Sequence, residues 1–196
     1  YFLTAERLED ARHSPQIEQA LKHGCDVLFF VDPVDEWLVD DFREYEGKKL
    51  VDIAKGDVQF GSEADQKAEK EANEKASADL KPFLDAVKEQ LKDNVSDVRV
   101  STRLADSPCC LVAGANALSA SMERMLRAMN QEVPHEKRLL EINAAHPLVE
   151  KMKGLTGDAL KDAVELLYDQ ALIVEGSAIP DPGRFTKLLT QLMLKP

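Results

Sequence analysis

The stretch between Arg103 and Met129 constrains the fold more than any other part of the chain. A turn cluster, Asp106-Ser107-Pro108, precedes an apolar run at residues 109–112, a pattern typical of a buried strand. After a loop, apolar side chains recur at the spacing of one helix face, at Leu118, Met122, Met125, Leu126 and Met129. A buried strand followed by an amphipathic helix predicts a fold that mixes helices with a sheet.

That helix face carries three of the chain's five methionines. Methionine is flexible and polarizable, so a methionine-rich face suits a surface that must fit many partners. Most apolar stripes of this kind are buried, however, and spacing alone favours a core position. Both interpretations stay open at this point.

The 196-residue chain has a formal net charge of −11, which is unevenly distributed. Residues 1–75 hold 10 Lys and Arg against 19 Asp and Glu, whereas residues 76–196 hold 15 against 17. An acidic half joined to a near-neutral half suggests two units, and no basic face could neutralise nucleic-acid phosphates. No apolar run approaches the roughly 18 residues of a transmembrane helix. Neither a nucleic acid nor a membrane is therefore expected as a partner.

Residues 1–56 are predicted to form a small α/β unit. Thr4 is expected to cap a first short helix, and Ser14-Pro15 combines an N-cap with a proline at the first position of a second. Gly24 is expected to end that second helix.

Two strands and a further helix are expected in the rest of this unit. The continuous apolar run at residues 25–31 is typical of a strand covered on both faces. Residues 50–54 are predicted as a second strand. Between them, a helix is expected to begin at Asp32-Pro33 and to end at Gly47, with four large apolar residues on it: Trp37, Leu38, Phe42 and Tyr45.

Residues 57–79 are predicted to form a charged helical linker, because Ala, Glu and Lys dominate it and almost nothing in it can be buried. It is expected to run into a better helix at residues 80–91. Pro82 fits only near the start of that helix, or else marks a kink.

Residues 80–196 are predicted to form the second unit, in which strands come early and helices late. Strands are expected at residues 98–102, 109–113 and 139–142, the last after a break at Val133-Pro134. Pro147 is expected to begin a short helix, Asp158 a long one, and Asp181-Pro182 a last one. The predicted fold class is α+β.

The two closing helices carry more apolar surface than one buried stripe requires. They could pair with the same helices of a second chain as a four-helix bundle, or they could cover the sheet of their own unit. The spacing does not separate these alternatives. The residues predicted for a dimer contact are Leu160, Val164, Leu167, Ala171, Leu188, Leu189 and Leu192.

No catalytic centre is visible in the sequence. The four histidines are scattered without metal-ligand spacing, and the three cysteines (Cys25, Cys109 and Cys110) suit neither a disulfide framework nor a zinc site. Cys109 and Cys110 could form a redox pair, but neighbours on a strand point to opposite faces, so buried and inert thiols are favoured. No catalytic residue, cofactor site or metal site is therefore predicted.

Several motifs, in this order and spacing, resemble the 90-kilodalton heat-shock protein chaperones, most closely their bacterial, HtpG-type members. The resemblance covers nearly the whole chain apart from the charged linker. It is carried by Val98–Val112 (VRVSTRLADSPCCLV), Ser121–Met125 (SMERM), Leu140–Asn143 (LEIN) with His146-Pro147-Leu148, Leu166–Leu172 (LLYDQAL), Asp32–Trp37 (DPVDEW) and Tyr45–Leu50 (YEGKKL).

The resemblance implies a fragment: residues 1–56 as the end of the middle domain and residues 80–196 as the carboxy-terminal dimerisation domain. It implies a cytoplasmic homodimer that hydrolyses ATP, with Mg, through domains upstream of Tyr1. It also implies that unfolded client proteins bind Trp37 and the helix face at Leu118, Met122, Met125, Leu126 and Met129, which would be partly exposed and converge on one cleft.

Cochaperones with tetratricopeptide repeats are not expected as partners. Eukaryotic cytosolic members of that family end in an acidic Met-Glu-Glu-Val-Asp tail that binds them, whereas this chain ends Leu-Met-Leu-Lys-Pro196. Two other functions remain open: a structural dimerisation module without chaperone activity, and a thiol-dependent enzyme that uses Cys109 or Cys110.

Overall fold

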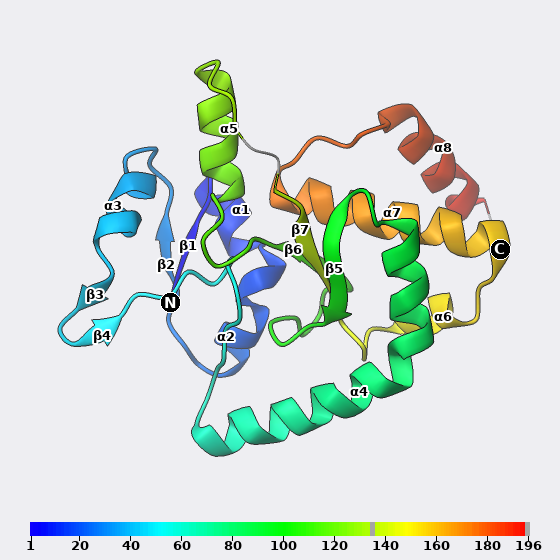
Figure 1. Cartoon of the computed structure of the whole chain (residues 1–196), viewed down its shortest axis with the longest axis horizontal. Coiled ribbons are helices and arrows are strands. Elements are labelled where there is room, and N and C mark those ends of the chain that lie inside the picture. The colour runs from blue at the N-terminus through cyan, green and yellow to red at the C-terminus, as the bar shows by residue number, and fades with distance from the viewer. Residues whose placement is uncertain (134–135, 195–196) are drawn as a thin grey trace.

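The second unit is built on a three-stranded sheet, β5 (Val95–Val100), β6 (Cys109–Val112) and β7 (Arg138–Ile142), in the order β5-β7-β6. β5 lies parallel to β7, and β6 lies antiparallel to it. The computed structural model in Figure 1 describes residues 1–133 and 136–194, and only the backbone of residues 40 and 41. Pro134 in the predicted break, His135, Lys195 and Pro196 lie outside the described residues. The three predicted strands are confirmed, each to within a few residues.

Helices α4 (Glu63–Gln90), α6 (Pro147–Lys153) and α7 (Gly157–Glu175) cover this sheet. Leu140 and Ile142 on β7 are fully buried, as are Val87 on α4 and Val164 on α7. These side chains belong to one hydrophobic core, which therefore joins both ends of the second unit in the sequence. The mixed helix-and-sheet class predicted from the sequence is confirmed.

The α4 helix is continuous across the predicted boundary at residue 79. Ser62 and Asp65 form a reciprocal capping box at its start, which satisfies two amide groups there. Its buried residues all lie in the second half, Leu80, Phe83, Leu84 and Val87, so the first half is a solvated helix. Pro82 lies inside the helix, and Figure 1 shows α4 changing direction along its length, as an interior proline explains.

The first unit contains two small sheets. β1 (Phe2–Thr4) lies parallel to β2 (Leu28–Phe30), while β3 (Glu44–Tyr45) and β4 (Lys48–Lys49) form a short hairpin. The helical elements are α1 (Leu8–Arg12), the 3-10 turn η1 (Pro15–Ile17), α2 (Glu18–Lys22) and α3 (Asp35–Asp41). The core of this unit includes Val58 and Phe60, so the unit extends beyond residue 56.

Ser14 caps η1 through a hydrogen bond from the Gln16 amide, as predicted, but other predictions for this unit are wrong. Thr4 lies in β1, and α1 begins at Leu8 without a side-chain cap. The helix expected to reach Gly47 ends at Asp41 because Glu46 and Gly47, with φ of 48° and 76°, form the turn of the β3–β4 hairpin. Phe42 therefore lies beyond the helix and Tyr45 lies in β3.

The two strands predicted in this unit are shorter than expected. Only residues 28–30 of the run at 25–31 form a strand, and Leu28 is 53% exposed, so this strand is not covered on both faces. Residues 50–54 form no strand; Asp52 alone makes a parallel bridge to Phe2. Apolar composition gave the wrong lengths because the neighbouring strands here are themselves only three residues long or shorter.

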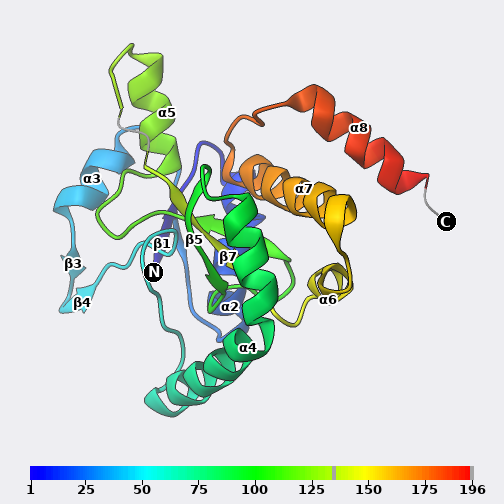
Figure 2. The ribbon, with the colours of Figure 1, turned by 45° about the vertical axis from the view of Figure 1, so that its right-hand side comes forward.

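The closing helices are α7 and α8 (Pro182–Met193), and Figure 2 shows α7 lying between the sheet and α8. Val164, Leu167 and Ala171 face the core of their own chain and are no more than 2% exposed, so their prediction as direct dimer contacts is wrong. The reason is that α7 covers β6, which takes up its most apolar face.

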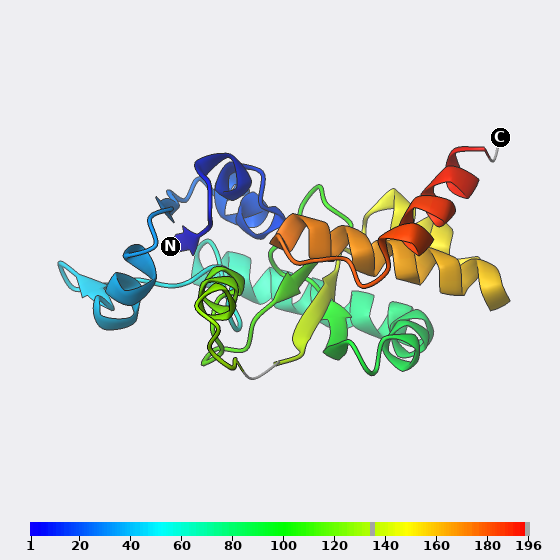
Figure 3. The same ribbon diagram turned by 90° about the horizontal axis from the view of Figure 1, so that it is seen from above.

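The remaining predicted contact residues lie farther out. Leu160 packs at the edge of the core, and Leu188 is buried. Leu189 and Leu192 are 39% and 51% exposed. Seen from above in Figure 3, α8 lies at the opposite end of the molecule from the first unit.

Candidate interaction surface and the junction that positions it

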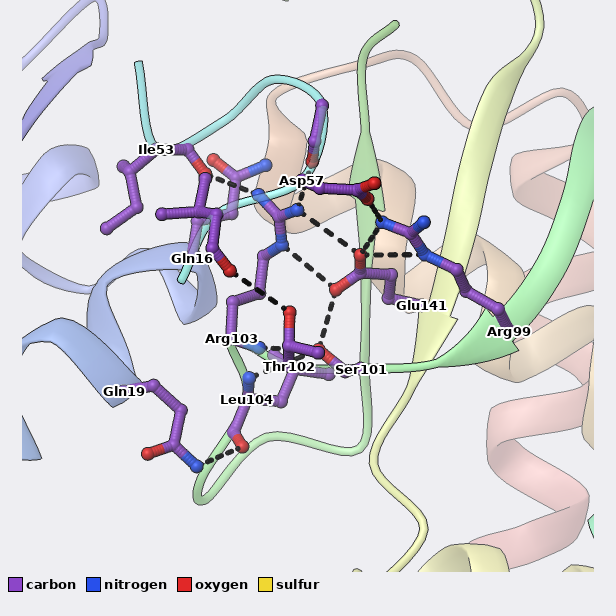
Figure 4. A network of polar contacts seen from close by, with 12 residues as sticks. Gln16, Gln19, Ile53, Asp57, Arg99, Ser101, Thr102, Arg103, Leu104 and Glu141 are labelled. Carbon is purple, nitrogen blue, oxygen red and sulfur yellow. Dashed lines mark hydrogen bonds and ion pairs between the residues drawn. The ribbon is translucent and has the colours of Figure 1, made fainter. Parts of the chain in front are cut away.

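Arg103 joins the two units from a fully buried position. Its Nε donates to Glu141 Oε2 at 2.9 Å, and its Nη2 reaches Glu141 Oε1 at 3.2 Å. The same guanidinium also donates to the backbone carbonyls of Ile53 and Gly56 in the first unit (Figure 4). A planar guanidinium, with donors in a fixed fork, can make these four contacts at once, whereas a lysine ammonium could not.

Glu141, on the central strand β7, is also fully buried and receives three donors. Besides Arg103, Ser101 Oγ donates to Oε2 at 2.7 Å, and Arg99 Nη2 donates to Oε1 at 2.7 Å. Arg99 in turn pairs with Asp57 at 2.6 Å, which extends the network into the first unit. A buried charge is tolerated when it is paired and its remaining lone pairs are satisfied, and this carboxylate meets both conditions.

Glu18 makes a second polar attachment between the units. Its carboxylate accepts from the amides of Ala105, Asp106 and Ser107 and from the Ser107 hydroxyl. Burial by itself would raise the pKa of this carboxyl, but these hydrogen bonds to the ionised form outweigh it and hold the pKa below its ordinary value. The turn cluster at residues 106–108 is thus bound by a helix of the other unit.

Backbone hydrogen bonds complete the junction. The Gly56 amide donates to the Ala113 carbonyl at 2.9 Å, and the Ala113 amide donates to the Ala54 carbonyl at 3.1 Å. Lys55 and Ala113 form the corresponding parallel bridge at the end of β6. The first unit is therefore held against the β6 edge of the sheet by side chains and backbone together.

A cleft of about 580 Å³ opens beside this junction. Its walls come from α3, the β3–β4 hairpin, residues 50–55 and the start of α5 (Ala120–Ala128). Ser119, the N-cap of α5, accepts from the Met122 amide and donates to Glu36 Oε2 at 2.8 Å, which ties α5 to α3. Leu118 and Met122 line the cleft, whereas Trp37, Met125, Leu126 and Met129 are outside its lining.

The charged side of α5 attaches the helix to the rest of the molecule. Glu123 pairs with Arg138 at 2.7 Å, and both side chains are largely buried. Arg124 pairs with Glu6 of the first unit and donates to the Glu175 carbonyl at the end of α7. Because the polar side is the attached one, much of the apolar side stays open.

The exposed fractions of the predicted surface residues follow from this attachment. Trp37 is 53% exposed, Met129 48% and Leu118 36%, and Met125 and Leu126 are half-buried. Met122 is only 6% exposed, so the expectation that it is partly exposed is wrong: it packs at the junction beneath its own N-cap. The stripe is thus core at one residue and surface at the other four.

The thiols do not form a reactive site. Cys109 Sγ donates to the Leu167 carbonyl at 3.3 Å, and burial raises the pKa of Cys109 to about 12. Burial also raises the pKa of Cys110 well above its ordinary value. Within residues 1–133 and 136–194 there is no group of three or more potential metal ligands and no helix long and apolar enough to cross a membrane.

Comparison with known proteins decides the family. The model of the Hsp90 protein family matches residues 1–196. The chaperone protein HtpG of Geobacter sulfurreducens is 47% identical over 199 residues, which cover 99% of this chain and 31% of that protein. HtpG of Alkalilimnicola ehrlichii is 45% identical, covering 98% of this chain and 30% of its own length, and HtpG of Paraburkholderia xenovorans is 44% identical, covering 99% and 30%. This chain belongs to the Hsp90 family. It spans about a third of the length of these relatives.

The polar junction of this Hsp90-family chain was not predicted from its sequence. Arg103 and Glu141 lie 38 residues apart, and a single arginine or glutamate has no periodicity to reveal its partner. One signal was present: Glu141 interrupts an otherwise apolar strand, and a charged residue in a buried strand requires a buried partner.

Replacing Glu141 with glutamine should strongly destabilise this Hsp90-family chain. The change leaves the Arg103 charge buried without its carboxylate, for which a loss of about 3–5 kcal/mol in the free energy of unfolding is expected. Urea denaturation followed by circular dichroism measures it. Glu150→Gln, which removes an exposed ion pair with Lys153, is the control and should change stability by less than about 1 kcal/mol. A loss for Glu141→Gln as small as that of the control would show that the junction does not depend on this charge.

The buried thiols predict a reactivity pattern. An aromatic disulfide reagent at neutral pH should react readily with only the partly buried Cys25, because Cys109 and Cys110 are buried and remain protonated. All three thiols should react after unfolding in denaturant. Rapid labelling of Cys109 or Cys110 in the folded chain, located by mass spectrometry of its peptides, would instead favour the thiol-enzyme alternative.

Proposed function

We propose that this chain serves an ATP-dependent, homodimeric molecular chaperone, in which it provides the dimer contact and part of the surface that binds unfolded client proteins. ATP and Mg would bind elsewhere in the whole protein, and no cofactor or metal role is proposed for residues 1–196. A cytoplasmic location is part of the proposal, and three free cysteines suit a reducing compartment.

The observation that carries the client role is the attachment of α5 by its charged side. Glu123 and Arg124 hold the helix to Arg138, Glu6 and the end of α7. The half-buried Met125 and Leu126 and the exposed Met129 are consequently available to other proteins. Exposed apolar patches on folded proteins usually mark interaction sites, and methionine adapts to partners of different shape.

A second apolar group on α3 supports the same role. Trp37 and Leu38 are 53% and 48% exposed, and the ring of Phe42 lies 6.2 Å from that of Tyr45 just beyond the helix. The Glu36–Ser119 hydrogen bond places α3 beside the start of α5. Together the two helices offer a chaperone an adaptable surface on both units.

Exposed apolar residues on the closing helices support the dimer role. On and beyond α8, Leu192 is 51% exposed and Met193 and Leu194 are each 78% exposed. Arg184 fixes the start of α8 to α7 through Asp162 and Glu165, at 2.7 Å and 3.0 Å. A helix attached at its start, with apolar residues open at its end, suits pairing with a second copy.

A structural dimerisation module without chaperone activity remains the alternative. It requires the α8 surface but has no use for an open apolar face on α3 and α5. Aggregation assays therefore separate the two functions, because the alternative predicts no protection of unfolded proteins.

The chain should suppress aggregation of a thermally unfolded reporter protein, as measured by light scattering. Combining Trp37→Ser with Leu126→Ser should weaken that protection several-fold, because each change removes apolar contact area, and should leave the melting temperature nearly unchanged. Leu21→Ser, at a residue of α2 that is 55% exposed, is the matched control and should keep full protection. Equal protection by both variants would argue against this surface.

The chain should have the solution mass of two copies. Replacing Leu189 and Leu192 with serine should reduce it to one, because both side chains are exposed in the single chain and polar groups would weaken a buried contact. Multi-angle light scattering measures the mass, and Leu28→Ser in the first unit is the control. A dimer that survives the double substitution would place the contact elsewhere.

A further inference from the structure

Glu36 has one carboxylate oxygen that is satisfied and one that is not. The residue is only 7% exposed and lines the 580 Å³ cleft. Its Oε2 accepts from Ser119, whereas its Oε1 is buried with no hydrogen-bond partner among the described residues. Buried polar atoms in native proteins are nearly always paired, because leaving one unpaired costs free energy. This oxygen therefore points to a donor from outside the chain.

The other charged residues of the cleft do not supply that donor. Lys55 pairs with the carboxylate of Asp52 at 3.5 Å, so these two largely balance each other. Arg43 makes an interaction of its own, and Glu44 and Lys49 are exposed at the hairpin. Within the cleft, Glu36 is thus the buried carboxylate with an unpaired oxygen.

The remaining walls suit the stem of a long side chain. Apolar lining comes from Val39 of α3, Leu50 of the first unit, and Leu118 and Met122 at α5. Lysine and arginine combine an apolar stem with a charged head, so they can pack on such walls while the head reaches a carboxylate. A metal ion fits less well, because no group of three potential ligands exists among the described residues.

The charge around the cleft favours a cation. Residues 32–46 contain a single basic residue, Arg43, against seven acidic ones, which are Asp32, Asp35, Glu36, Asp40, Asp41, Glu44 and Glu46. A field of one sign at the mouth of a cleft raises the local concentration of ligands of the opposite sign. Uncharged or acidic segments would gain nothing from it.

We infer that the cleft between α3, the β3–β4 hairpin and the start of α5 binds a lysine or arginine side chain of an extended client segment. Glu36 Oε1 accepts the hydrogen bond of the cationic head, and apolar neighbours of that residue contact Leu118 and Trp37. The inference rests on the proposed chaperone function and adds a chemical preference to it: client segments in which a basic residue lies among apolar ones.

The test compares two fluorescent, unstructured peptides that share one apolar sequence and differ at a single central position. One carries lysine there and the other norleucine, which keeps the stem and removes the charge. Fluorescence anisotropy with the chain 1–196 gives both dissociation constants. The lysine peptide should bind about tenfold more tightly, the size expected of one charge-assisted hydrogen bond.

Variants assign that preference to Glu36. Glu36→Gln should abolish the difference between the peptides. Asp32→Asn removes the same charge from an exposed position in the same segment and should keep it. Glu36→Asp, which retains the charge on a shorter stem, should keep part of it, and melting temperatures check that each variant is folded.

The outcomes are distinguishable. Equal binding of the two peptides to the unmodified chain would overturn the inference and leave the chaperone proposal standing. A lysine preference that Glu36→Gln and Asp32→Asn reduce equally would assign it to the general field and overturn the role of Glu36. Failure of the chain to bind either peptide would count against the proposed function itself.

Discussion

The buried ion pair of Arg103 and Glu141 is the interaction on which the rest of the structure depends. Removing two charges from water costs several kcal/mol for each ion, and only close pairing with full hydrogen bonding offsets it. Here the carboxylate receives Arg103, Arg99 and Ser101, while the guanidinium also holds two carbonyls of the first unit. The pair therefore satisfies itself only when both units are in place. That condition makes the junction specific, because a shifted first unit would leave buried donors unpaired.

The interaction surface follows from this junction. Since the first unit is held against the β6 edge, α3 lies beside the start of α5, and the Glu36–Ser119 hydrogen bond joins them. Arg124 uses the same arrangement to reach Glu6 across the junction. Each of these contacts occupies a polar group and leaves an apolar one open. In an Hsp90-family chain, polar attachment of a helix is thus a way to keep methionine and leucine side chains accessible without loosening the fold.

The closing helices distribute their apolar surface differently. The side of α7 with Val164, Leu167 and Ala171 is used within the chain, which the helix spacing had left open as one of two alternatives. What remains for a second copy lies mainly at the end of α8, where Leu192, Met193 and Leu194 are exposed. Sequence patterns show how much apolar surface a helix has, but not which neighbour covers it, because a sheet of the same chain and a helix of another chain bury the same side chains.

The sequence by itself determined the elements of the second unit, since strand alternation, helix spacing and the caps at Pro147 and Asp181 are local signals. It also determined the family, through motifs spread along the whole chain. Only the tertiary structure decided which residues become the junction, because the partners of Arg103, Glu141 and Glu18 lie 38 to 89 residues away and pair only after folding. The short strands of the first unit depend on such contacts too, as does the burial of Met122. Local periodicity carries no information about contacts made between distant segments, and in this protein those contacts decide what stays exposed.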